Sequence, residues 1–237
     1  MGLSFDTRTS DSSWISTVWT CASEDVAMMR GVASETWGLV FWSEDGSPQA
    51  AVVGPQSRTS VASVPSEASF VGIEFKVGTS LRIADMVSIV DGGIALPDAR
   101  SHSFWLDGRR WTTPVADDAE LFVDQLIRHG VIARDPVVTA VARGDRPVLS
   151  SRTVERRFRA ATGLTRGTIA QIERVRTASV MLATGEHVPD IVDGSAISTS
   201  PTLCGCCAAT SGDQLSSCAR ARAERSDLIS LNERGRR

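Results

Sequence analysis

The 237-residue chain lacks both kinds of segment that would direct it to or through a membrane. No stretch approaches the roughly 20 consecutive apolar residues that a membrane-spanning helix needs. Its start, MGLSFDTRTSDSSW, has neither the basic region nor the apolar core of a secretory signal. The composition, with 42% hydrophobic and 22% charged residues, is that of a globular protein. We therefore expect a cytoplasmic protein with no membrane partner.

Histidine is scarce, with three residues at His102, His129 and His187. Two of them lie in or beyond the part that we expect to be helical, and no pair has the spacing of metal ligands. Cys21 has no His or Asp partner visible in the sequence. These absences argue against a metal-dependent or nucleophilic enzyme. We therefore expect no catalytic residue, no metal and no cofactor.

Lysine is almost absent, because Lys76 is the sole lysine among 25 basic residues. Such a bias is typical of a GC-rich coding sequence. The formal net charge of -3 excludes a uniformly basic surface, but the charges are segregated. From Arg143 to Arg176 there are nine Arg against three acidic residues, whereas residues 1–120 are mildly acidic. A basic block in an acidic chain predicts a local polyanion-binding face, with a solvated helix surface as the alternative.

A β-rich part is expected over residues 1–116. Short apolar or alternating runs at 38–42, 50–54 and 70–78 are separated by Gly, Pro, Ser and Asp, as strands and their turns require. All six tryptophans lie in this part. In a small β-barrel they are first of all core residues, and one or two could line a ligand cavity.

A helical part is expected over residues 117–194, because the spacing of apolar residues changes there to a helical period. The first helix should end at Gly130. Asp135 should cap a second helix that has Pro136 in its first turn. A third helix should stop at Gly163.

Residues 135–164 have the pattern of a helix-turn-helix, in which two short helices are joined by a tight turn. In the second helix Val154 and Phe158 are four residues apart, so they should form its core contact with the first helix. Ser150 or Ser151 should cap it. The opposite side suits a DNA major groove, since Arg can bond two acceptors on guanine and Glu can accept from cytosine. The residues on that side are Arg152, Glu155, Arg156 and Arg159.

The run LSSRTVERRFRAATGLT, followed by IERVRTASVML in a helix from roughly Arg166 to Thr184, resembles the first helix-turn-helix and linker helix of the AraC family of transcription regulators. The family pattern Leu-Ser-x-Arg-x-Leu/Val-x-Arg-x-Phe with a Gly-containing turn fits residues 149–163 throughout. The resemblance implies double-stranded DNA as the partner. It implies base-reading positions at Arg152, Glu155 and Arg156. It implies phosphate contacts at Ser151, Thr153 and Arg157. The alternative is a helical hairpin with a solvated basic face.

The N-terminal half contains GIEFKVGT and ALPDARSHSFWLDGRRW, and it resembles the cupin-like sensor half of such regulators. The implied fold class is α+β, with an N-terminal cupin-like barrel followed by an all-α AraC-type domain at 117–194. The resemblance also implies that the β-rich part binds a small-molecule effector or a second copy of the chain. No residue spacing selects a particular effector.

AraC-type proteins carry a second helix-turn-helix, with the signature Gly-Tyr/Phe-x-Asp-Gln-x-His-Leu/Phe-x-Arg. Here PDIVDG is a fair start, but the following SAISTSPTLCGCCAATSG does not continue it. We back-translated that segment with permitted codons, most of which end in G or C. Read from the third base of each codon, it gives GYFDQPHLVRLLRRYIG. One deleted base after the Gly194 codon accounts for the change, so we interpret residues 195–237 as an out-of-frame, disordered tail.

This interpretation also removes a candidate zinc site, because the codons of Cys204, Cys206 and Cys207 would encode Arg and Leu in the other frame. It predicts an impaired regulator that binds DNA weakly or not at all, since one of two recognition helices is missing. Two alternatives stay open. One is an interaction module that dimerises with an intact paralogue without binding DNA, and the other, less favoured, is a cupin-type enzyme.

Overall fold

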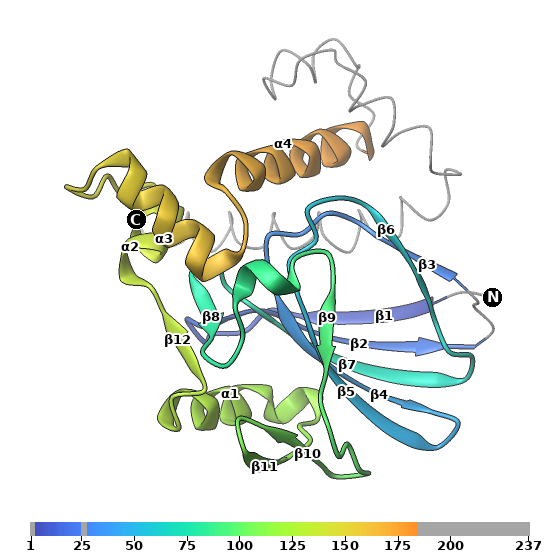
Figure 1. Ribbon diagram of the computed structural model, residues 1–237. Helices are drawn as coiled ribbons and strands as arrows, with labels where there is room; N and C mark the ends of the chain where they lie inside the picture. The colour runs from blue at the N-terminus through green and yellow to red at the C-terminus, as the bar shows by residue number, and fades with distance from the viewer. Residues whose placement is uncertain (1–2, 25–27, 184–237) are drawn as a thin grey trace. The chain divides into compact units, whose positions relative to one another are not determined.

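The computed structural model describes residues 3–24 and 28–183, and the chain divides into two compact units, Met1–Thr168 and Ile169–Arg237. The described residues form a mixed α+β fold whose N-terminal part is β-rich (Figure 1). The predicted boundary between residues 116 and 117 lies inside the first unit. The expected out-of-frame tail lies outside the described residues.

The first unit combines many short strands with short helices. Its strands are β1 (Leu3–Arg8), β2 (Ile15–Ser23), β3 (Met28–Gly31), β4 (Gly38–Glu44), β5 (Ser47–Val53), β6 (Ser60–Ser63), β7 (Ala68–Phe75), β8 (Thr79–Leu81), β9 (Gly93–Ala95), β10 (Ser103–Leu106), β11 (Arg109–Thr112) and β12 (Ile132–Arg134). Its helices are the 3-10 turns η1 (Met86–Ile89) and η2 (Ala116–Asp118), then α1 (Ala119–Arg128), α2 (Pro136–Ala142) and α3 (Ser151–Thr162). The chain then enters α4 (Arg166–Ala183), whose later residues are the described part of the second unit. None of the described helices is long and apolar enough to cross a bilayer.

The main sheet is six-stranded and antiparallel, in the order β1-β2-β7-β4-β5-β9. Val18 pairs with Ile73, Ile73 with Leu39, and Leu39 with Val52, so one buried row crosses the four central strands. Alternate residues of a strand face the same side, which makes this row one face of the core. The β-rich character predicted for residues 1–116 is therefore confirmed.

Two of the hairpins turn on an Asp-Gly pair. Asp45 and Gly46 between β4 and β5 have φ of 49° and 72°, and Asp107 and Gly108 between β10 and β11 have φ of 54° and 66°. Two consecutive residues with positive φ match the right-handed twist of the flanking strands, and Asp-Gly is a preferred sequence for such turns. The second hairpin thus comprises residues 103–112.

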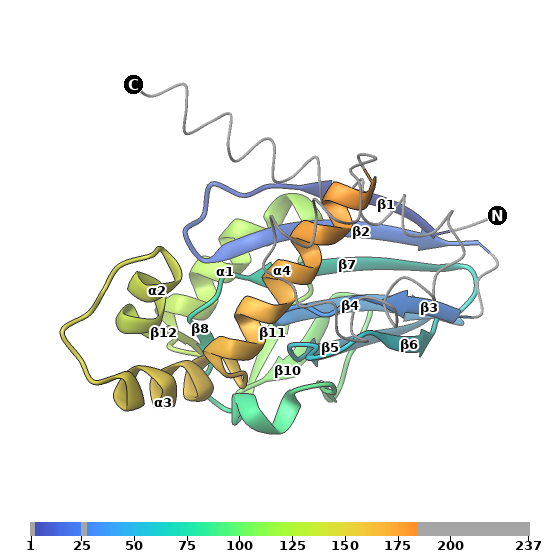
Figure 2. The ribbon, with the colours of Figure 1, turned by 90° about the horizontal axis from the view of Figure 1, so that it is seen from above.

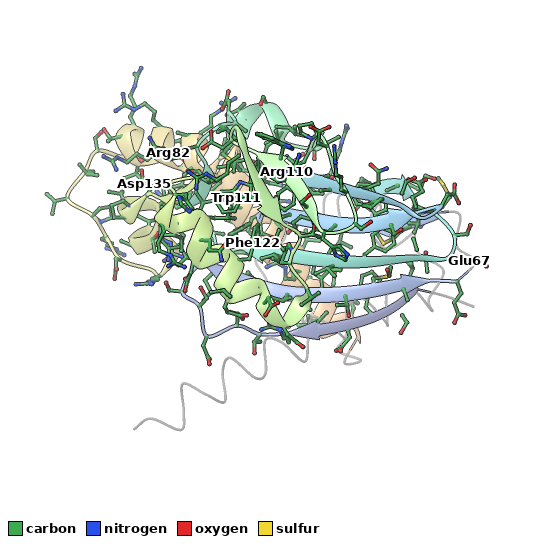
Figure 3. All side chains as sticks on the ribbon, turned by 90° about the horizontal axis from the view of Figure 1, so that it is seen from below. Glu67, Arg82, Arg110, Trp111, Phe122 and Asp135 are labelled. Carbon is green, nitrogen blue, oxygen red and sulfur yellow. The ribbon has the colours of Figure 1, made fainter. Side chains whose placement is uncertain are left out.

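Aromatic residues join the β10–β11 hairpin to α1. Phe122 of α1 lies 6.1 Å from Trp111 and 6.0 Å from Phe104, measured between ring centres and in edge-on geometry. Figure 3 shows Trp111 and Phe122 close together under the hairpin. Trp37 and Trp111 are buried, whereas the other four tryptophans are partly buried. The expectation that tryptophans build the core is confirmed for these two residues.

A second link joins β1 to α1 by an ion pair. Arg8 donates from both terminal nitrogens to Glu120, at 2.6 and 2.7 Å, and also to the carbonyl of Ala116. The hydrogen bonds from Arg8 lower the pKa of Glu120 from 4.5 to about 2. Because both side chains keep about a third of their surface exposed, solvent screening limits the contribution to about 1 kcal/mol.

This pKa predicts acid sensitivity. A folded-state pKa below the unfolded value stabilises the fold above about pH 4.5, and this stabilisation is lost as the pH falls toward 2. Glu120→Gln should therefore lower the free energy of unfolding by about 1 kcal/mol at neutral pH and by much less near pH 2. Urea unfolding of both proteins across this range measures the difference. A constant difference at every pH would contradict the assigned role of Glu120.

One element corrects the sequence prediction. The strand β12 lies within the stretch expected to be all-α, and it pairs antiparallel with β8, Ile132 opposite Leu81 and Arg134 opposite Thr79. The prediction of a purely helical part is wrong here, because a strand of three residues is too short for hydrophobic periodicity to reveal. In Figure 2 β12 leads from α1 to α2. The strand thereby connects the helices to the β-rich part.

Candidate nucleic-acid interface

The helix α3 begins and ends where its sequence signals indicate. Ser150 has extended backbone angles, and its Oγ accepts a hydrogen bond of 3.2 Å from the backbone N–H of Thr153. This settles the choice between Ser150 and Ser151 as the cap. Gly163 ends the helix with a left-handed φ of 74°, which favours glycine. Both ends are thus fixed locally.

One face of α3 is buried. Val154 and Phe158 are 4% and 3% exposed, and the helix contacts α2, η1 and β8. At its end a Cβ on Gly163 would lie 2.4 Å from the carbonyl oxygen of Met86 in η1, so glycine is needed here for space as well as for its φ. The predicted core residues Val154 and Phe158 therefore lie on the face that holds α3 in the first unit.

The other face of α3 is basic and exposed. Arg152, Arg156 and Arg159 are exposed, and the first turn contains no acidic residue. A cation in the first turn opposes the helix dipole and costs about 0.3–1 kcal/mol, so Arg152 does not serve the stability of the helix. An exposed arginine at this position is available to an anionic partner.

Arg157, predicted as a phosphate contact, has a partner inside the protein. Its Nη1 donates to both carboxylate oxygens of Asp135, at 3.1 and 3.2 Å. Asp135 caps α2 as predicted, because its Oδ1 accepts from the backbone N–H groups of Val137 and Val138. Arg157 therefore ties α3 to the start of α2, where Figure 3 labels Asp135. A phosphate would have to compete with this ion pair, and the predicted contact stays untested.

Glu155, predicted as a base reader, also has a partner within the chain. Its Oε1 accepts a hydrogen bond of 3.3 Å from the backbone N–H of Arg166, the first residue of α4. The guanidinium of Arg166 lies 5.7 Å from the centre of the Phe158 ring. Glu155 thus stabilises an otherwise unpaired N–H at a helix start. Its reading of a base remains a prediction.

The two small predicted phosphate contacts lie at the start of α3. Ser151 is exposed, and Thr153 is partly buried with its Oγ1 2.9 Å from the Oγ of Ser150. Hydroxyl groups and free N–H groups at a helix start are suitable for a phosphate. The structure therefore groups Ser151 and Thr153 with Arg152, and it gives Arg157 and Glu155 internal bonds.

The connection between α2 and α3 differs from the prediction. It spans residues 143–150, whereas a helix-turn-helix has a turn of about three to four residues. Gly144 has a φ of 95°, and Pro147 disfavours helical geometry in the residue before it. The expectation of a tight turn is wrong for this reason. Val148 in this segment is fully exposed.

No group of three or more His, Cys, Asp or Glu residues within residues 3–24 and 28–183 could hold a metal ion. His129 lies 5.5 Å from the Trp111 ring and 3.2 Å from a nitrogen of Arg109, and His102 is exposed. His187 and the four cysteines Cys204, Cys206, Cys207 and Cys218 lie outside the described residues.

Further cations lie beside α2, and the sequence prediction missed them as a group. Lys76 follows β7, Arg134 ends β12 and Arg143 follows α2. We call these three residues the cation patch. Its one sequence signal is that Lys76 is the sole lysine of the chain. Pairing of β12 with β8 brings Arg134 close to Lys76, and neither strand was predicted individually. Arg143 lies one helical turn after Thr139, the α2 residue that packs against Gly78.

Comparison with known proteins finds no matching family model, no similar curated protein and no similar solved structure.

Proposed function

We propose that this chain is a cytoplasmic DNA-binding transcription regulator of the AraC type that retains one of two helix-turn-helix units, and that of the two expected outcomes, weak binding or none, it binds DNA weakly. In this proposal α3 enters the major groove of double-stranded DNA, with Arg152 and Arg156 against base edges. The β-rich part takes a small-molecule effector or a second copy of the chain.

The division of α3 into two faces is the observation that carries the proposal. Val154 and Phe158 hold one face in the protein, whereas Arg152 and Arg156 extend from the other and have no carboxylate partner within the described part. A recognition helix needs one face packed firmly against the protein and hydrogen-bond donors on the other face that are free to contact DNA. A solvated basic hairpin needs no cation at Arg152, where the helix dipole disfavours it.

This contrast gives a test that separates DNA binding from stability. Arg152→Glu should leave thermal stability unchanged or raise it by about 0.3–1 kcal/mol, because an acidic residue suits the helix start. The same change should weaken DNA binding by about 1–3 kcal/mol, or roughly tenfold or more, because a base contact becomes a repulsion. Thermal unfolding and fluorescence anisotropy at low salt, about 50 mM, measure the two effects.

Arg30→Glu is the matched control, since Arg30 is an exposed arginine of β3 with no ion pair among the described residues and the charge change is the same. It should affect DNA binding less than Arg152→Glu. Equal losses of DNA affinity in the two variants would mean that α3 contributes to binding only through the overall charge of the protein. Unchanged DNA binding by the Arg152 variant would show that α3 is not part of the DNA interface.

A further inference from the structure

Two of the three residues of the cation patch, Lys76 and Arg134, contact one short stretch of chain between β1 and β2. The Nζ of Lys76 donates to the carbonyl of Ser12 at 3.0 Å. The guanidinium of Arg134 donates to the carbonyl of Ser13 and lies 4.2 Å from the centre of the Trp14 ring. Both cations are thus fixed by consecutive residues of the same connection. This fixing reduces the conformational entropy that either side chain would lose on binding a ligand.

The patch has no counter-charge of its own. Within residues 3–24 and 28–183 none of its members forms an ion pair with a carboxylate. Burial and the charges of Arg134 and Arg143 lower the pKa of Lys76, and burial and the charge of Arg143 lower the pKa of Arg134. The three cations therefore repel one another. The Nε of Arg134 is in addition buried without a hydrogen-bond partner.

The patch lies against α2. Gly78, two residues after Lys76, accepts a hydrogen bond of 2.9 Å from the N–H of Asp135 through its carbonyl. A Cβ on Gly78 would lie 2.9 Å from the Oγ1 of Thr139 in α2, so the turn after β7 packs closely against this helix. Arg134 and Arg143 flank α2 along the chain. In helix-turn-helix proteins the first helix crosses the phosphate backbone while the second lies in the groove.

Resting on the proposed function, we propose that Lys76, Arg134 and Arg143 bind a backbone phosphate of DNA beside α2. The DNA interface then extends from α3 past α2 onto the β-rich part. Bound phosphate replaces the repulsion among the cations with attraction. DNA binding thereby links the turn after β7 to the helix-turn-helix through a common ligand.

The sole lysine allows a direct test on the full chain. Acetylation of amines with an activated ester, followed by mass spectrometry, reports on Lys76, and a lysine-containing peptide added to the solution serves as the reference. A short DNA duplex should slow the modification of Lys76 several-fold relative to that of the reference peptide. If Lys76 reacts equally fast in protein that anisotropy shows to be bound to the duplex, the phosphate contact is overturned.

Variants give a second readout. Lys76→Gln combined with Arg143→Gln should reduce the slope of log K against log salt by about 0.9, which is the contribution of the one phosphate that these residues share. Base preference should not change. Thermal stability should change little, because the removed repulsion offsets the hydrogen bond lost between Lys76 and Ser12, and this separates the result from misfolding. Arg30→Gln removes an exposed cation that has no ion pair among the described residues, so it is the control and should leave the slope nearly unchanged.

The outcomes separate the two proposals. If Arg152→Glu weakens binding while the Lys76 and Arg143 variant keeps the full salt slope, the patch contact fails and the proposed function stands. If the unaltered chain binds no duplex even at about 50 mM salt, both fail together.

Discussion

A coding sequence with one base inserted after the Gly194 codon is expected to yield a protein that binds DNA at least a hundred times more tightly than the present chain does. By the out-of-frame interpretation the restored frame reads DIVDGLGYFDQPHLVRLLRRYIG, which resembles the second AraC-type signature, and we expect it to supply the second recognition helix. Each base contact of such a helix contributes about 1–3 kcal/mol, and its phosphate contacts add a salt-dependent share. Two or three regained contacts amount to several kcal/mol, and each 1.4 kcal/mol is about tenfold in affinity. Anisotropy titrations of both proteins at the same salt concentration measure the gain.

The matched control for this experiment is a three-base insertion at the same place. It adds one residue but keeps the original frame, so it should bind DNA as the original chain does. Equal binding by the frame-restored and control proteins would contradict the out-of-frame interpretation. Sequencing of the coding DNA around Gly194 provides an independent check, because the interpretation requires a run similar to GGCTCGGCTATTTCGACC.

Phe158→Ala is expected to have the largest effect on stability. The ring is 3% exposed on the face by which α3 contacts α2, η1 and β8, so its removal leaves a cavity among fixed neighbours. Truncation of a buried Phe costs about 3–5 kcal/mol. We expect earlier urea unfolding and faster amide exchange in α2 and α3. DNA binding should fall in parallel, because α3 then loses its fixed orientation.

Val148→Ala is the control for Phe158→Ala. Val148 lies in the adjoining segment and is fully exposed, so its truncation should change stability by less than about 0.5 kcal/mol. If the two variants unfold alike, the buried face of α3 does not hold the helix in the first unit.

Local sequence signals predicted the ends of the helices well. Asp135 with Pro136, Ser150 and Gly163 are cap residues whose chemistry acts within a few positions, and the structure places each at the expected end. The burial of Val154 and Phe158 follows from their spacing in the same way. The Asp-Gly pair at Asp107 is a local signal of the same kind for the β10–β11 hairpin, but the prediction did not use it.

Long-range contacts could not be predicted in the same way. The bond between Arg157 and Asp135 joins two helices across the connection, and nothing in the spacing of these residues distinguishes it from a free arginine. The cation patch requires the pairing of β8 with β12, two strands of three residues each. Such short strands carry no periodicity of their own.

The arginines of α3 differ in the contacts that they make within the protein. Arg157 stabilises the pair of helices through Asp135, whereas Arg152 and Arg156 remain exposed. Mutation of Arg157 should therefore combine a stability defect with any loss of binding. Arg152 and Arg156 are the better pair for a test of base reading.

The most direct test of α3 as a reader of DNA is selection of bound duplexes from a randomised pool at low salt. The chain should enrich a short base preference, and a chain with Arg152→Ala and Arg156→Ala should lose that preference while it keeps salt-dependent binding. An unchanged preference in the double variant, or no preference in the unaltered chain at any salt concentration, would contradict the account.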